Sequence, residues 1–213
     1  MTPNEYPDDP QPWRVEQSDY IYRQRWLTVR KDAVRLPGGG YMPDYYLFEY
    51  MDWVNVVAVT TAGHLVLIRL YRHGIGQTLF ELCAGAVDPP PPGVDPRSAA
   101  YLLATAQREL REETGFGGGT WQLFMTTSAN TGTHTNLNYT FLATGVERVG
   151  AQDLEDTEEI TVHLLSPAEA WEVVNAGQMK QAMCLAPLLN YLARLGGSTL
   201  SDSQQQQDSP GQG

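Results

Sequence analysis

The chain has 213 residues, of which 42% are hydrophobic, and a formal net charge of −11 at pH 7. This length allows one sizeable core in one or two domains, and the negative charge argues against nucleic-acid binding through a basic surface. No apolar run is long enough to span a bilayer, and the polar N-terminus does not resemble a signal peptide. The two cysteines have no spacing typical of a disulfide framework, which predicts free thiols in the cytoplasm.

The first quarter of the chain is predicted to be a tail followed by strands. Residues 1–12 are polar and rich in proline, which is typical of a disordered tail. Residues 13–50 are rich in aromatic side chains, which favour strands. Aromatic and β-branched residues between glycine-containing turns predict strands over Tyr20–Arg30, Tyr45–Met51, Val54–Thr60 and His64–Tyr71.

A loop and a long helix are predicted next. The four consecutive prolines Pro89–Pro92 exclude helix and predict an extended loop. Asp95 and Pro96 are typical of an N-cap and a first helical residue, so we expect a helix from there to about Thr114. Gly115 suits the left-handed turn that ends many helices.

The end of this helix carries three carboxylates on one face. Glu109, Glu112 and Glu113 stand at i, i+3 and i+4, so their side chains project from adjacent positions. Such like charges weaken a helix unless a cation lies between them, and Mg²⁺ takes oxygen ligands and bridges phosphate oxygens. The alternative is an ordinary solvated acidic face. Arg108 lies four residues before Glu112 and is expected to brace it.

The remaining elements complete a mixed sheet flanked by helices, an α+β arrangement. Ser166 and Glu169 form a capping-box pattern that opens a short helix to about Asn175. A final helix is expected from about Met183 to Leu195, and residues 196–213 are rich in Ser, Gln and Gly, as in a disordered tail. Further strands are predicted over Trp121–Met125, Asn138–Thr144 and Thr161–Leu165.

The string from Arg108 to Phe116 is similar, without a mismatch, to the second half of the Nudix hydrolase signature, R-E-U-x-E-E-x-G-U with U a bulky apolar residue. Arg69–Arg72 followed by Glu81–Gly85 resembles the subfamily of ADP-ribose pyrophosphatases and nucleoside-diphosphate-sugar hydrolases. The resemblance implies an α/β/α sandwich with the Nudix domain at residues 51–195 and a β-rich extension at 13–50. It also implies Mg²⁺-dependent hydrolysis of the diphosphate bond of ADP-ribose or a related nucleotide sugar, with Mn²⁺ as a substitute ion, giving AMP and a sugar phosphate.

The resemblance further implies the roles of individual residues. The metal ligands would be the Ala84 carbonyl, Glu109, Glu112 and Glu113, and Glu109 and Glu113 are also the expected catalytic residues. Gly85 is expected at the substrate. In addition, the subfamily exchanges N-terminal strands between two subunits, so we expect a homodimer; simple sheet packing is the other reading of the aromatic residues in 13–50.

Three expected site residues keep two readings each. Glu158 is either the base that activates water or a solvated carboxylate of an acidic loop. Arg72 either clamps a phosphate or ribose of the substrate or forms a salt bridge at a strand end. Glu81 either contributes to the substrate site, for example through a second metal ion, or makes a structural contact.

The first half of the signature is altered. The signature places a glutamate eight positions before the arginine, where this chain has Ala100. Gly85 stands 23 positions before Arg108 instead of the usual 14, and the extra residues fall in the proline loop. A catalytically weak or silent nucleotide-binding module is therefore an alternative to the enzyme, as is a structural protein with an acidic helix. Within the enzyme class, GDP-mannose, other nucleotide sugars and dinucleotide coenzymes stay open as substrates.

Overall fold

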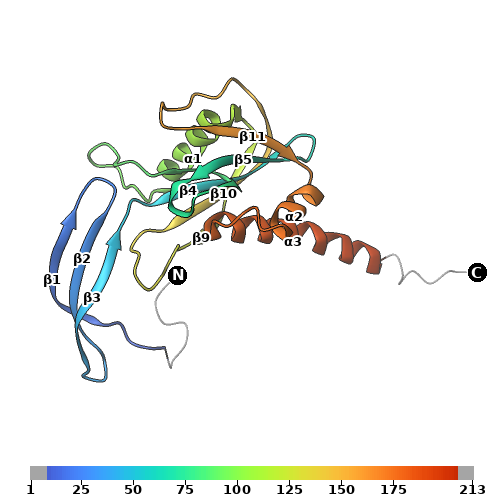
Figure 1. Ribbon diagram of the computed structural model, residues 1–213. Coiled ribbons are helices and arrows are strands. Elements are labelled where there is room, and N and C mark those ends of the chain that lie inside the picture. The colour runs from blue at the N-terminus through green and yellow to red at the C-terminus, as the bar shows by residue number, and fades with distance from the viewer. Residues whose placement is uncertain (1–8, 206–213) are drawn as a thin grey trace, which may run out of the picture. The chain divides into compact units, whose positions relative to one another are not determined.

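A computed structural model describes residues 9–205, which divide into two compact units (Figure 1). The first unit comprises the chain up to Met51 together with Asn130–Asn136, and the second comprises Asp52–Ala129 and the chain from Leu137 onward. The predictions for residues 1–8 and 206–213 lie outside the described residues. Within the described residues, no helix combines the length and the apolar character needed to cross a membrane.

The first unit is a three-stranded antiparallel sheet of β1 (Arg14–Arg23), β2 (Thr28–Arg35) and β3 (Tyr41–Glu49), in that order. The segment 130–136 attaches to β3, because the Phe48 N–H donates to the Thr133 carbonyl at 2.8 Å. The single strand predicted over Tyr20–Arg30 is wrong. A turn in which the Gln24 N–H donates to the Leu27 carbonyl at 3.0 Å separates β1 from β2. This turn lacks the glycine or proline by which turns are usually recognised.

The second unit is built on one mixed sheet, which confirms the predicted architecture. The strand order is β11-β5-β4-β10, with β8 and β9 both pairing with β10, β6 with β5 and β7 with β4. β10 runs parallel to β4, and the other pairs are antiparallel. The strands are β4 (Trp53–Thr60), β5 (Leu65–Arg72), β6 (Gln77–Glu81), β7 (Cys83–Ala86), β8 (Phe116–Gly117), β9 (Thr120–Thr127), β10 (Asn138–Arg148) and β11 (Ile160–Leu165).

Helices cover both faces of this sheet, as the α/β/α prediction required (Figure 1). Side chains alternate across β4, so that Val54 and Val56 pack in the core under α1 (Ala99–Thr114). Val57 and Val59 face the opposite core, formed with α2 (Pro167–Asn175) and α3 (Ala182–Gln205). A short 3₁₀ turn, η1 (His73–Ile75), links β5 to β6.

The helix boundaries differ from prediction at two places. The helix expected from Asp95 begins at Ala99, because the Asp95 carboxylate accepts the Arg97 N–H at 2.9 Å and closes a separate turn before it. The last helix continues to Gln205, past its expected end at Leu195, so residues 196–205 are helical and not part of a tail. The expected ends at Gly115, which has a φ of 74°, and at the Ser166 capping box are confirmed.

A division of the sheet at its centre positions the site. β4 and β5 pair only at Ala58–Val66 and Val59–Leu65. Beyond these pairs β5 continues with β6, whereas β4 continues with β7. The backbone of β7 therefore lies in the middle of the sheet, with α1 packed against one of its faces.

Candidate active site

The carboxylates at the end of α1 lie against the backbone of β7. The glutamates share one face of the helix, and the buried Leu110, fully covered in the core, fixes the rotation of that face. Glu113 is 5% exposed, and one of its carboxylate oxygens accepts the Ala84 N–H at 3.0 Å. The predicted metal ligands Glu113 and Ala84 are thus brought together by one hydrogen bond.

Gly85 allows the second carboxylate to approach the same strand. A Cβ atom added at Gly85 would lie 2.0 Å from Cδ of Glu109 and 2.2 Å from Oε1, which is inside any real contact distance. The Glu109 side chain therefore occupies the space that a side chain at position 85 would fill. Position 85 therefore requires glycine because a larger side chain has no space there, and not because of the backbone angles.

Burial makes these two carboxyl groups difficult to ionise. It raises the pKa of Glu109 to about 7, and the carboxylates of Glu112 and Glu158 add to the rise while Arg108 opposes it. Burial also raises the pKa of Glu113 to about 7, against the Cys83 thiol and the Ala84 N–H, which stabilise the charged form. A cation bound to both groups would relieve this cost.

Arg108 supplies the positive charge that the site contains. Its guanidinium donates to Glu112 and to Glu109, each at 2.7 Å, and lies 3.5 Å from the Asp88 carboxylate. Ala100, which replaces the signature glutamate, is exposed in the first turn of α1. The expected bracing of Glu112 is therefore present, and Asp88 in the altered loop adds a partner that the sequence did not predict.

The donor set suits a hard divalent cation, since it consists of carboxylate and carbonyl oxygens. Within the described part of the chain, no three His, Cys, Asp or Glu side chains are grouped so as to hold a metal ion. Arg108 donates to one oxygen of Glu109 and to one oxygen of Glu112, so it leaves the second oxygen of each carboxylate for a cation.

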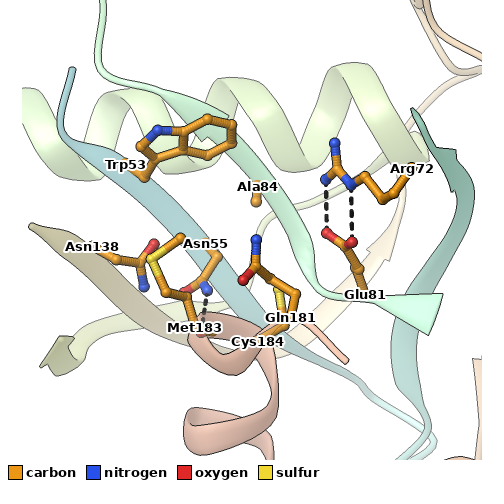
Figure 2. Close-up of a pocket in the computed structure, with 9 residues that line it drawn as sticks. All are labelled: Trp53, Asn55, Arg72, Glu81, Ala84, Asn138, Gln181, Met183 and Cys184. Carbon is orange, nitrogen blue, oxygen red and sulfur yellow. Dashed lines mark hydrogen bonds and ion pairs between the residues drawn. The ribbon is translucent and has the colours of Figure 1, made fainter. Parts of the chain in front are cut away.

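Arg72 and Glu81 form a pair at the divided edge of the sheet (Figure 2). Nε and Nη2 of Arg72 donate to the two oxygens of Glu81 at 2.9 and 2.7 Å, and Glu81 is 2% exposed. Arg72 and Glu81 thus form with each other the structural contact that was one of the two roles expected for each. The guanidinium keeps further N–H donors, and 38% of the Arg72 side chain stays exposed, so a phosphate has access to it.

Glu158 lies on the loop that precedes β11. The loop is tied to the end of α1, because the Asp153 N–H donates to the Glu112 carbonyl at 2.8 Å and the Gln152 amide donates to the Glu113 carbonyl at 2.7 Å. Glu158 itself is exposed and accepts the Glu155 N–H at 3.0 Å. It is close enough to raise the pKa of both Glu109 and Glu113.

A pocket beside Arg72 includes residues that the sequence did not single out. Trp53, Asn55, Asn138 and Gln181 line it together with Glu81 and Ala84 (Figure 2). The available signal was an asparagine inside an otherwise apolar strand, as at Asn55 in Val54–Thr60. Such a residue is unusual in a buried strand and marks a polar site.

Comparisons with known proteins cover nearly all of the described chain. Residues 13–48 match the family model described as nucleoside diphosphate sugar hydrolase N-terminal domain, and residues 50–184 match the NUDIX domain. The chain is 31% identical over 173 residues to the ADP-ribose pyrophosphatase of Mycobacterium tuberculosis, covering 81% of this chain and 79% of that protein.

Two further comparisons extend this likeness. The chain is 28% identical over 188 residues to the CMP-5'-(N-acetyl-N-hydroxy-3-aminopropyl)phosphonate hydrolase of Streptomyces rubellomurinus, covering 87% of this chain and 84% of that protein. A crystal structure of an ADP compounds hydrolase has the same fold, with a TM-score of 0.70 at 19% identity over 89% of this chain and 97% of that one.

The contact between Gly85 and Glu109 generates a first prediction. Gly85→Ala should weaken Mg²⁺ binding by about 10- to 100-fold, because the new methyl group displaces a metal-ligand carboxylate. Titration calorimetry with Mg²⁺ measures the effect, and thermal unfolding checks that the fold is kept. Gly38→Ala is the matched control, since no atom lies within 4 Å of its added Cβ. Equal Mg²⁺ affinity in both variants would contradict the assignment of Glu109.

Proposed function

The chain belongs to the Nudix hydrolase family and is a nucleoside-diphosphate-sugar hydrolase of the ADP-ribose pyrophosphatase type, and we propose that it cleaves the diphosphate of ADP-ribose or a related nucleotide sugar in a Mg²⁺-dependent reaction. The products would be AMP, or the corresponding nucleoside monophosphate, and a sugar phosphate. The observation that carries the proposal is the pair of buried carboxylates, Glu109 and Glu113, held against β7 beside the Ala84 carbonyl.

In this proposal Glu109, Glu112, Glu113 and the Ala84 carbonyl would hold Mg²⁺, for which Mn²⁺ would serve as a substitute. The bound ion would neutralise the bridging phosphates and make a bound water more acidic. The chain contributes the fixed positions of the oxygens, since the Ala84 N–H orients Glu113 and Gly85 leaves room for Glu109.

Two further residues would act on water and substrate. Glu158 is proposed to orient or deprotonate the attacking water, and its loop is anchored to α1 through Gln152. Arg72 is proposed to bind a phosphate of the substrate with the N–H groups that Glu81 leaves open. Glu81 then serves to hold the guanidinium in place, because it is buried and bound to it at two points.

One observation favours a second candidate function, a nucleotide-binding module with weak or absent catalysis. Arg108 lacks the signature glutamate at position 100 and binds two of the proposed metal ligands instead. In this arrangement the single positive charge of Arg108 offsets part of the negative charge of the two carboxylates and so weakens their attraction for a metal ion.

Release of AMP separates the two candidates. We expect purified protein with Mg²⁺ to release AMP from ADP-ribose, and chelation of the metal to abolish the reaction. A panel of other nucleotide sugars, including GDP-mannose, ranks the substrates. Binding of ADP-ribose without turnover on any member of the panel would replace the enzyme by the binding module.

The assignment of the buried Glu113 as a metal ligand gives a second test of the proposal. Glu113→Gln should lower kcat by on the order of 100-fold or more with the fold intact, because it removes a ligand charge and preserves the shape of the side chain. Steady-state kinetics with ADP-ribose and Mg²⁺ measures the loss. Glu172→Gln, on an exposed position of α2, is the control and should keep the activity of the unmodified chain. Full activity of Glu113→Gln would remove that residue from the site.

We also propose that the protein is a homodimer formed through its N-terminal sheet. All ten residues of β1 are exposed, and this strand forms an edge of the sheet. Exposed edge strands with apolar side chains pair readily with another chain. The exposed large hydrophobic side chains of this unit are Trp13, Val15, Tyr20, Ile21, Tyr22, Trp26, Tyr41, Tyr46 and Tyr50.

A single charged substitution tests this association. Ile21→Asp should shift the protein from dimer to monomer in sedimentation velocity at micromolar concentration, because it places a charge in the apolar surface of β1. Ile21 lies at an irregularity of the strand register, so the sheet itself should tolerate the change. Leu164→Asp, at another exposed apolar position on β11, is the control and should leave the dimer unchanged. A monomer in the unmodified protein would refute the dimer.

A further inference from the structure

A single side chain, that of Gln152, closes the connection between β10 and β11. Residues 153–159, the acidic loop, lie in this connection and are mostly exposed. Nε2 of Gln152 donates to the Glu113 carbonyl at 2.7 Å and to the Ile160 carbonyl at 3.2 Å. Since Ile160 is the first residue of β11, one amide joins the two ends of the acidic loop to each other and to α1.

The end of α1 supplies the acceptors for this connection. Because α1 ends at Thr114, the Glu113 carbonyl is among the last four of the helix and has no partner within it. The Glu112 carbonyl is in the same situation and accepts the Asp153 N–H at 2.8 Å. Two of the proposed metal ligands are thus bound, through their main chain, to Gln152 and to the first residue of the acidic loop.

Inside the acidic loop, Glu158 is held by a local turn. Its N–H donates to the Glu155 carbonyl at 2.9 Å, and its carboxylate accepts the Glu155 N–H at 3.0 Å. Neither of these two bonds reaches outside the loop, and residues 155–159 are exposed. The place of this turn relative to α1 therefore depends on what holds the ends of the loop.

The place of the turn matters because Glu158 lies near the buried carboxylates. Burial raises the pKa of Glu109 and of Glu113, and the charge of Glu158 adds to the rise at both groups. A segment with few buried contacts opens easily, and its opening would carry Glu158 away from α1. A group that fixes the two ends of the loop therefore also fixes the distance between these carboxylates.

We propose that Gln152 is a positioning residue of the site, which holds the acidic loop closed so that Glu158 stays beside the proposed metal ligands. This role rests on the proposed function, in which Glu158 orients or deprotonates the attacking water. Gln152 itself touches neither water nor substrate in the reaction and acts through Glu158. A displacement of about 1 Å in the groups around the reacting atoms is enough to lower a rate by about 100-fold.

The role belongs to the N–H groups of Gln152 and not to the bulk of its side chain. An amide nitrogen carries two N–H donors, which match the two carbonyl acceptors. A side chain of the same length without donors fills the space but leaves both carbonyls without this bond. A carboxylate in the same place only accepts hydrogen bonds, so it would face two carbonyl oxygens and be repelled by them.

The test compares Gln152→Met and Gln152→Glu with the unmodified full chain. Both variants keep the length of the side chain and lose its donors, so kcat with ADP-ribose and Mg²⁺ should fall about tenfold or more. The Kd for Mg²⁺ should stay within about twofold, because no metal-ligand side chain is changed. Hydrogen exchange at the main-chain N–H groups of residues 153–159 should become faster, and this is measured without turnover.

A double-mutant cycle with Glu158→Gln shows whether the effect passes through Glu158. If it does, Gln152→Met should change the kcat of the Glu158→Gln chain by less than about twofold. A side chain needed only for packing would lower kcat by the same factor in both backgrounds. Gln122→Met, at an exposed position of β9, is the matched control and should keep the kcat of the unmodified chain. Gln152→Ala, which admits water to the freed carbonyls, replaces Gln152→Met if that variant does not fold.

A normal kcat in folded Gln152→Met, unchanged exchange of the acidic loop, or equal losses in the two backgrounds of the cycle would each overturn this role of Gln152. A parallel loss of Mg²⁺ affinity would do so as well, since it would indicate a distorted α1. Absence of turnover in the unmodified chain is a different outcome, because it refutes the proposed function itself and this role with it.

Discussion

The burial of two carboxylates against the backbone of β7 is the constraint on which the rest of the site depends. Removing a carboxylate from water is costly unless hydrogen bonds or a cation replace the lost solvation. The Ala84 N–H and the guanidinium of Arg108 replace part of it, and because burial still raises the pKa of both Glu109 and Glu113, part of the cost remains. A site with this remaining cost gains more from a divalent cation than an exposed acidic face does.

The division of the sheet turns this constraint into a two-sided site. Since side chains alternate along β7, Cys83 and Gly85 face α1, whereas Ala84 between them faces the pocket near α3. One strand thus separates the carboxylates from the pocket, and it contributes to both.

Local sequence spacing predicted those parts of the molecule that local spacing determines. The face of Glu109, Glu112 and Glu113 follows from the helical repeat, and the capping box at Ser166 from neighbouring residues. The turn after β1 was missed because it has no glycine or proline. The pocket was missed because Asn55 and Asn138 meet only through the pairing of β4 with β10, which is a contact between distant parts of the chain. The attachment of residues 130–136 to β3 is of the same kind.

The replacement of the signature glutamate by Ala100 and the longer proline loop belong to the same structural change. Without a partner at position 100, the guanidinium of Arg108 contacts Glu109 and Glu112. The loop begins at Asp88, whose carboxylate lies 3.5 Å from the same guanidinium and whose carbonyl accepts the Tyr101 hydroxyl at 3.3 Å. Asp88 thus adds to Arg108 a carboxylate partner that is not one of the proposed metal ligands. The loop therefore gives Arg108 a negative partner outside α1 in place of the glutamate missing at position 100, so the altered signature is compatible with a working metal site.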